Sequence, residues 1–489
     1  MLSLGVATRP LPSPILTRPR YPALQARLRY VVSAAFGIDT RSLAIFRVGL
    51  GVILLLDLGL RTHFFGALLT DAGVLPRATL ATAPWEPWAW SLHAVSGGGW
   101  WQAALFAVAA AAALALLAGW HTRAANVASW FLLVSLHHRN PIVLNAGDQL
   151  LRALLFWAMF LPLGAVWSVD ARRTGGRAAR VYSAASASLL IQVAVVYLMT
   201  ALFKYSPEWY VQGTALYYAF NIDALATPFG TWLLGFPGLL KGLTFATVAL
   251  ELGGPLLALL SLGGRLRLVI VLAFVGLHLG IAATLHLGLF PVVCLVAWIP
   301  FLPSRVWRVP PEDGTIGGSG WATVTVAAVL LLILQWNLHT LPGTGPAPGA
   351  TSTAIHLLGL RQRWGMFERQ TLTSDGWYVA PAWLPDGRTV DLLRGGAALA
   401  WARPQNIAAT YHMDRWRKYL LQLAQPRREA YRAGLLTYLC RQSKSPPDSV
   451  ALVFMHERTL PPGERPTLEQ LPLGAIPCSP NDRDPGASR

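Results

Sequence analysis

Long apolar runs, separated by short segments that carry arginine, dominate the first two thirds of the chain. An α-helix needs roughly 20 apolar residues to cross the hydrocarbon core of a bilayer. Several runs have only about 16, so we expect some helices to be bent or partly re-entrant. The pattern predicts nine membrane helices, at about residues 43–61, 102–119, 124–138, 148–167, 188–203, 241–260, 268–286, 289–303 and 321–340.

The last third of the chain has a different pattern. A Gly/Pro-rich linker is expected over residues 341–355, and two alternating stretches then flank Pro385-Asp386-Gly387, which is typical of a β-hairpin. Residues 414–424 have a helical pattern, and residues 449–460 have a strand pattern. The predicted fold class is therefore an all-α polytopic membrane domain over residues 39–340, followed by a small extramembrane α+β domain over residues 356–489.

Composition supports a membrane protein. Of the residues, 54% are hydrophobic and only 13% are charged, and the mean hydropathy is +0.44. A soluble domain has a lower apolar content. The formal net charge of +17 does not indicate nucleic-acid binding, because the arginines lie in short segments between apolar runs and form no single basic face. The expected partner is the lipid bilayer.

The distribution of basic residues predicts the orientation of the helices, because Lys and Arg near helix ends are retained on the cytoplasmic side. With segment 1–38 in the cytoplasm, most arginines fall on the inner side. The outer connections then hold only Arg61, Arg77, Arg139, Lys204 and Lys241. We therefore expect a cell-membrane protein whose C-terminal domain is external, in the periplasm if the cell is Gram-negative.

The three cysteines do not form a metal or redox motif, and no metal-ligand cluster is predicted. Cys294 lies in an apolar run. Cys440 and Cys478 lie in the C-terminal part, where an oxidising compartment would allow a disulfide. The sequence leaves two alternatives open, a Cys440–Cys478 disulfide or two unpaired thiols.

Ionisable residues inside the apolar runs are costly in a bilayer and usually face a partner or a cavity. Arg47 and Asp57 share the first run but lie about 15 Å apart along a helix. We expect Arg47 to snorkel to the inner interface or to find another partner, and Asp57 to be hydrated near the outer end. Asn145 or Asp148 can supply the N-cap of the next helix. Asp148 and Arg152 lie one turn apart, so a helical ion pair is favoured over a direct role in substrate binding.

Glu251 precedes Gly253, Gly254 and Pro255, a sequence that favours a bend in a helix. Its carboxylate is a candidate to bind a cation or accept a proton, but we expect it to pair with Arg47 or Arg152. His278 and His286 lie about 12 Å apart along a helix, too far to chelate one metal ion.

Lys204 ends the fifth run, in the stretch TALFKYSPEW. Anchoring at the membrane surface is the favoured role, with Glu208 nearby as a structural partner. If instead the lysine lay in a closed apolar pocket, loss of water would lower its pKa and make it a usable base.

Several ordered motifs resemble the HTTM membrane domain, the family that includes vitamin K-dependent gamma-carboxylase. They are LAIFRVGLGVILLLDL, TDAGVLPR, RNPIVLNAGDQLLR, FLPLGAVWSVD, TALFKYSPEW, LATPFGTWL and HLGIAATLHLGLFP, and they span about residues 39–303. The arginine- and alanine-rich style is similar to that of a bacterial member. The resemblance implies that Lys204 matches the lysine that deprotonates vitamin K hydroquinone in the carboxylase. It also implies that His278 and the LGLFP turn match a histidine and a turn of that enzyme.

Two departures limit this comparison. Gly147 or Asp148 stands where the resemblance predicts a histidine, and the C-terminal region is much shorter than that of the carboxylase. Glutamate carboxylation is therefore not carried over. The first hypothesis is an outward-facing pocket for a quinol-like or other lipophilic molecule, with Lys204 as base, His278 or His286 as hydrogen-bonding groups, and Asn145, Asp148, Arg152, Glu208 and Glu251 around the substrate. The alternative is a non-enzymatic scaffold or lipid-binding protein that presents its C-terminal domain to an external protein partner.

Overall fold

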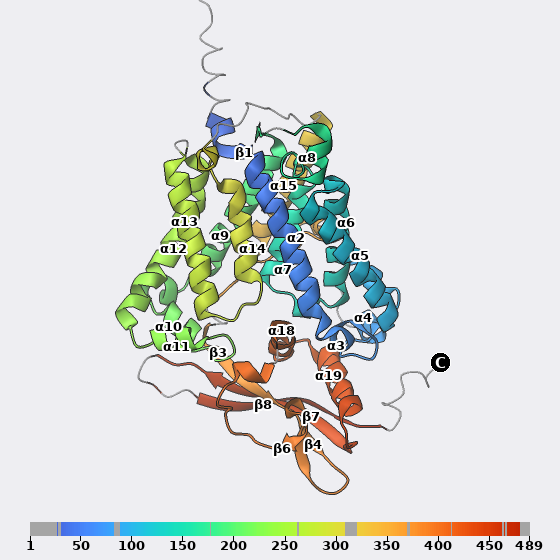
Figure 1. The fold of residues 1–489 in the computed structure, drawn as a ribbon. Helices are drawn as coiled ribbons and strands as arrows, with labels where there is room; N and C mark the ends of the chain where they lie inside the picture. Colours follow the sequence, from blue (N-terminus) through green and yellow to red (C-terminus); the bar gives the residue numbers. More distant parts are fainter. Residues whose placement is uncertain are drawn as a thin grey trace, which may run out of the picture.

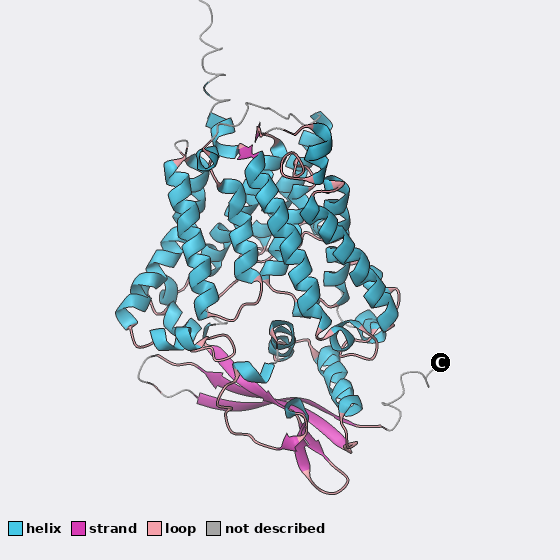
Figure 2. Cartoon of the chain, in the orientation of Figure 1, coloured by secondary structure: helices cyan, strands magenta, loops and turns pink. Residues whose placement is uncertain are grey.

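In the computed structural model, helices fill most of the molecule and strands gather mainly at one end (Figure 2). The structure describes residues 27, 31–82, 89–176, 178–261, 264–308, 320–368, 372–411, 413–461, 464 and 467–479. Most of the expected N-terminal segment 1–38 lies outside these residues. A bundle of helices makes up the larger part of the molecule, and a β-sheet with two helices lies against one end of the bundle (Figure 1).

In the described part of the chain, six helices are long and apolar enough to cross a membrane. They are α2 (Thr40–Thr62), α5 (Gly99–Ala118), α9 (Ala184–Phe203), α12 (Pro237–Leu260), α13 (Arg265–Thr284) and α15 (Gly320–His339). The other three expected spans correspond to α6 (Thr122–Arg139), α7 (Ala146–Ala158) and α14 (Phe290–Trp298), which are shorter or more polar. A helix of 13 residues, such as α7, is only about 20 Å long. Nine complete spans are therefore not confirmed.

Short helices connect the long ones, and the last of the short helices follows the last long one. They are α3 (Phe65–Leu69), α4 (Arg77–Thr82), α8 (Val169–Thr174), α10 (Ala215–Phe220), α11 (Pro228–Leu233) and α16 (Gly349–Leu357), with 3-10 turns at Leu92–Ala94, Pro141–Val143, Ile299–Phe301 and Ser304–Trp307 and a π-helical turn at Glu208–Gln212. A two-stranded pair, β1 (Ile38–Asp39) with β2 (Arg180–Val181), closes the end opposite the sheet (Figure 1).

Strand β1 and the C-terminal sheet lie at opposite ends of the bundle (Figure 1).

Of the two outcomes expected for Arg47 on α2, the structure has the second, a partner for the guanidinium group. Its side chain is buried, and Nη2 donates a 2.7 Å hydrogen bond to the carbonyl oxygen of Trp167. Gly119 makes room for it: this residue ends α5 in the left-handed conformation, and a Cβ atom there would lie 1.6 Å from Nη1 of Arg47. Glycine is thus required at this position both by its φ of 69° and by the close approach.

The C-terminal domain is built on an antiparallel sheet, with six strands among the described residues. They are β3 (Ser374–Val379), β4 (Pro381–Trp383), β5 (Thr389–Asp391), β6 (Ala397–Ala398), β7 (Ser449–Arg458) and β8 (Thr467–Pro477). The central strand β7 pairs with β3 and β4 on one side and with β8 on the other. Strands β4 and β5 form the hairpin predicted around Pro385-Asp386-Gly387, and the predicted helix and strand correspond to α18 (Asp414–Leu423) and β7.

Helix α18 lies between the sheet and the helical bundle (Figure 1). One apolar core continues across this junction, because Phe106 and Ile142 of the bundle belong to the same cluster as Trp377 and Trp416 of the C-terminal domain. The segment that follows the Gly/Pro-rich stretch also packs against the bundle, where Trp364 is fully buried. The two parts of the molecule therefore share a packed interface.

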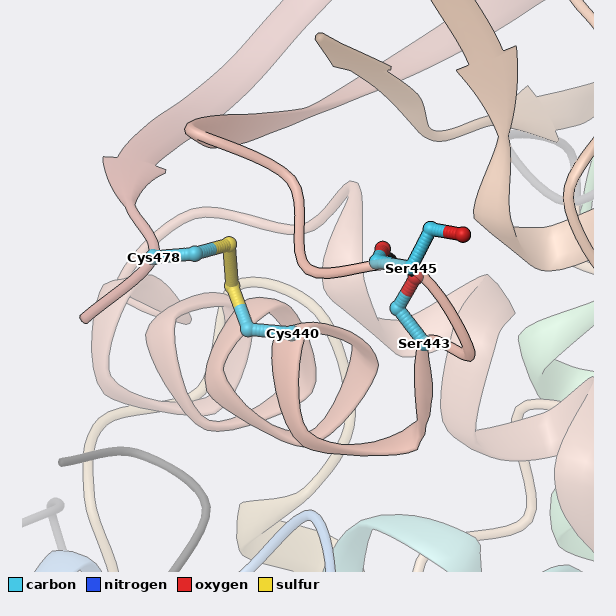
Figure 3. The surroundings of a disulfide bond; sticks show 4 residues. All are labelled: Cys440, Ser443, Ser445 and Cys478. Carbon is cyan, nitrogen blue, oxygen red and sulfur yellow. Dashed lines mark hydrogen bonds between the residues drawn. A yellow bond between two sulfur atoms is a disulfide. The ribbon is translucent and has the colours of Figure 1, made fainter. Parts of the chain in front are cut away.

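A disulfide joins Cys440 on α19 (Glu429–Gln442) to Cys478, which follows β8 (Figure 3). Their Cα atoms lie 5.7 Å apart. Of the two alternatives left open by the sequence, the structure has the disulfide, which fastens the end of the last described strand to α19. Cys294 on α14 is a buried free thiol.

Candidate functional site

Lys204 directly follows α9 and is almost completely buried, with 4% of its surface exposed. Its Nζ donates hydrogen bonds to both carboxylate oxygens of Glu251 on α12, at 2.6 and 2.7 Å. The ring of Trp209 lies beside the ammonium group, with its centroid 4.3 Å from Nζ. Glu251 is buried as well. These contacts form a buried ion pair between α9 and α12, supported by a cation–π contact.

This pairing corrects two expectations. The partner of Lys204 is Glu251 on a neighbouring helix, not the sequence-adjacent Glu208. Glu251 in turn does not pair with Arg47 or Arg152, because its two oxygens face Lys204. Glu208 lies in the π-helical turn beside Trp209, where it is buried.

The two predicted histidines lie in different surroundings. His278 on α13 is buried, and its Nδ1 donates a 2.8 Å hydrogen bond to the carbonyl oxygen of Phe274. Its Nε2 then accepts from the hydroxyl of Tyr197 at 3.3 Å, and this hydroxyl accepts from Trp298 at 2.9 Å. His286 is exposed in the turn after α13. The structure does not bring the two histidines together.

A second charged cluster joins the bundle to the C-terminal domain. Asp57 and Arg61 on α2 and Asp148 on α7 are buried with Arg415 on α18. Arg61 donates to Asp57 at 2.7 Å and to Asp148 at 3.1 Å. Arg415 donates to Asp57 and to Oδ1 of Asp148, each at 2.7 Å, and also to Oδ2 of Asp148. Two carboxylates thus face two guanidinium groups, and the cluster has no net charge.

The neighbouring carboxylates determine the charge state of Arg415. Burial opposes its positive charge, but the carboxylates of Asp148 and Asp57 outweigh that penalty and raise the pKa of the guanidinium group. Asp57, which was expected to be hydrated, is instead enclosed in the network. The charged form of Arg415 is therefore an integral part of the junction.

Ligand atoms of Asp57, His137 and Asp148 lie within 4.8 Å of one another, a grouping that could hold a metal ion. Arg61 and Arg415 already bond the carboxylate oxygens of this group. A metal ion at this position would have to displace both guanidinium groups. The arginines supply the positive charge that the two carboxylates require.

Of the two candidate caps, Asn145 organises the start of α7. Its side chain accepts from the backbone N–H of Asp148, and Asp148 accepts in return from the backbone N–H of Asn145, which forms a capping box. The amide of Asn145 also donates to Asp414 of α18 at 3.3 Å. Arg152 does not form the expected hydrogen-bonded pair with Asp148, and donates instead to the carbonyl oxygen of Arg361 at 3.0 Å.

A cavity of about 890 Å³ lies between the bundle and the C-terminal domain. His286 and Asp223 line it from the bundle side, and Arg403 and Asp414 line it from the other side. Lys204 is not among its lining residues. The candidate site residues therefore fall into four places: the Lys204–Glu251 pair, the His278–Tyr197 pair, the start of α7 beside the charged cluster, and the cavity at the junction.

A comparison with family models matches the HTTM domain over residues 37–307, more than half of the chain. The chain belongs to the HTTM family. The HTTM domain runs from just before β1 to the 3-10 turn at Ser304–Trp307, and it includes both Lys204 and Glu251. Arg415 and the C-terminal domain lie outside the HTTM match. Neither the curated proteins nor the solved structures that were searched contain a match to the chain.

Several parts of the site carried little signal in the sequence. The exception is the pair of Asp57 and Arg61. These residues lie one helical turn apart, so the spacing argument used for Asp148 and Arg152 could have predicted their ion pair. No local pattern links Arg415 to residues more than 260 positions earlier in the chain. His137 joins the charged cluster through packing between helices. Trp209 lies only five residues after Lys204, so its contact with the ammonium group is local in the sequence.

Proposed function

We propose that this chain is a gamma-carboxylase-like membrane protein whose Lys204–Glu251 pair accepts a proton from a quinol-like or other lipophilic substrate. The observation that carries the proposal is the pair itself, a lysine and a glutamate held at 2.6 and 2.7 Å inside an apolar bundle. Burying two charges costs more free energy than packing two apolar side chains of similar size. An ionisable pair inside a membrane domain is therefore a candidate for function.

The geometry supports a specific route for the proton. In the low dielectric of the bundle, the proton can lie on Lys204 or on Glu251, and when it lies on Glu251 the amine of Lys204 has a free lone pair. A substrate hydroxyl then transfers its proton to the amine as its O–H bond breaks. The products are a substrate oxyanion, an ammonium group and a protonated carboxyl. The pair gains one proton, and the ammonium group stabilises the oxyanion.

The remaining predicted residues take supporting roles under this proposal. His278 on α13 is hydrogen-bonded to Tyr197 on α9, the helix that ends just before Lys204. Helix α13 packs beside α12. Asn145, Asp148 and Arg152 hold the start of α7 and its contact with the C-terminal domain. The lipophilic molecule would enter from the bilayer, on the side of the C-terminal domain, which we propose is external.

The test is mass spectrometry of lipids and quinones that copurify with the chain. The Lys204→Met and Glu251→Gln variants should lose a molecule that the native chain retains, because each removes one half of the polar pair. Lys241→Met is the matched control, since Lys241 is an exposed lysine on the same helix as Glu251. If all three variants retain the same molecule as the native chain, the pair does not form the binding site.

The second candidate function is a membrane scaffold that presents the C-terminal domain to an external protein. It is favoured by Arg415, which fixes this domain to the bundle. Under this alternative the Lys204–Glu251 pair only joins α9 to α12. Both residues can be replaced by apolar ones in the double variant Lys204→Met with Glu251→Leu. Under the scaffold alternative, cells that carry this variant should behave like cells that carry the native chain. The proton-transfer proposal predicts instead that they behave like cells without the chain.

A further inference from the structure

The cavity at the junction has walls from both parts of the molecule. Pro228 and Thr231 of α11 line one side, and the loop with Arg403 and Asn406 lines the other. Its volume of about 890 Å³ lies within the range of small-molecule sites. Helix α11 lies at the end of the bundle that faces the sheet (Figure 1). The cavity is thus placed where the bundle meets the C-terminal domain.

The charged groups of the cavity are paired. Arg403 bonds Asp223 and lies 3.5 Å from a carboxylate oxygen of Glu457. Arg417 bonds Asp414 and also donates to the carbonyl oxygen of Ala224 at 3.1 Å. A polyanion would need free positive charge in such a place, because its own charge must be compensated when water is removed. A zwitterion has no net charge, so it leaves the charge balance of the lining unchanged, and its two charged groups can bond the exposed parts of Arg403 and Asp223.

One wall of the cavity also borders an aromatic surface. Phe229 and Trp232 on α11 are 48% and 59% exposed, and their rings stack with centroids 5.6 Å apart. Aromatic residues of this kind gather where the membrane meets water. Since Pro228 and Thr231 on the same helix line the cavity, a molecule can place a polar head in the cavity and an apolar tail along α11.

We propose that the junction cavity binds the zwitterionic head of an amphiphile, with its ammonium group near Asp223 or Asp414 and its phosphate or carboxylate near Arg403. Its tail lies against Phe229 and Trp232. The exposed guanidinium face of Arg403 offers the geometry that phosphate and carboxylate groups prefer. This site is separate from Lys204, so the amphiphile proposal and the proton-transfer proposal can be tested independently.

The test uses the full-length chain in detergent after removal of bound lipid. Thermal stability is measured as three compounds are added: short-chain phosphatidylethanolamine, phosphatidylglycerol with the same tails, and phosphoethanolamine without tails. Binding to the native state raises the melting temperature. We expect phosphatidylethanolamine to bind at least about tenfold more tightly than either of the other two, a difference of about 1.4 kcal/mol.

Two variants locate the binding. Arg403→Gln removes the charge that faces the anionic group, and Ala409→Trp fills the cavity without changing its charge. Each should weaken phosphatidylethanolamine binding at least about tenfold, while Arg388→Gln, in the exposed turn of the β4–β5 hairpin, should not. Equal binding of phosphatidylethanolamine and phosphatidylglycerol would overturn the zwitterion assignment. Equal binding of phosphoethanolamine would overturn the role of the tail, and full binding by Ala409→Trp would overturn the site.

Discussion

The contact of Arg415 with the helical bundle gives a direct test of how the two parts of the molecule depend on each other. Arg415 supplies one of the two positive charges that balance Asp57 and Asp148, and all of these side chains are buried. Replacing it in an Arg415→Met variant keeps an apolar stem of similar length. It also leaves the cluster with two carboxylates and one guanidinium group.

The expected loss of stability follows from the contacts that disappear. Arg415 donates to both oxygens of Asp148, to Asp57 and to the carbonyl oxygen of Val143. Removing one partner of a buried ion pair typically costs about 3–5 kcal/mol, because the remaining charge is buried without compensation. This free energy corresponds to a change of roughly two to four orders of magnitude in the folding equilibrium.

The assay is thermal unfolding of the detergent-solubilised chain, combined with limited proteolysis between the bundle and the sheet. Arg415→Met should melt roughly 3–5 °C lower and be cleaved faster. Adding Asp57→Asn restores the charge balance, because Asp148 then faces Arg61 alone, and should recover part of the loss. The control is Arg388→Met, since Arg388 pairs with Asp386 on an exposed hairpin. If Arg415→Met unfolds like the control, the junction cluster does not stabilise the fold.

Three further predictions concern other parts of the chain. Burial raises the pKa of Asp375 to about 7, well above the value of an unfolded aspartate, so ionisation destabilises the fold. Stability should fall by up to about 4 kcal/mol as the pH rises from about 4 to about 7, and Asp375→Asn should flatten this profile in pH-dependent melting. Replacing Cys440 and Cys478 together by serine should cost up to about 4 kcal/mol, seen as a lower melting temperature that reductant no longer changes. The Lys204→Met variant should be less stable than the double variant Lys204→Met with Glu251→Leu, because the single change leaves a buried carboxylate alone; the reverse order in melting experiments would refute the ion pair.

Much of the architecture could be predicted from the sequence, because it depends on local pattern. Apolar runs of helical length identified each long helix of the bundle, and the Pro385-Asp386-Gly387 turn identified the β4–β5 hairpin. The length of helix α7 was overestimated. The apolar run continues to residue 167, but the helix ends at Ala158, before the turn that contains Pro162. Proline and glycine in that turn stop the helix although the composition remains apolar.

The candidate site was less predictable, because its partners are distant in the sequence. Lys204 and Glu251 were both identified as candidates, but their pairing depends on how α9 and α12 pack. Nearby charges in the sequence, Glu208 for Lys204 and Arg152 for Asp148, gave the wrong partners. Helix periodicity shows which residues share a face, but it does not show which helix lies opposite that face.

The proton-transfer proposal is tested most directly by infrared difference spectroscopy of the chain when a short-chain quinol is added. We predict that quinol binding produces the carbonyl band of a protonated carboxylic acid, assigned to Glu251 because it is absent in Glu251→Gln and in Lys204→Met but present in Lys241→Met. If the quinol binds to the native chain and no such band appears, or if the band persists in Glu251→Gln, the Lys204–Glu251 pair is not the proton acceptor.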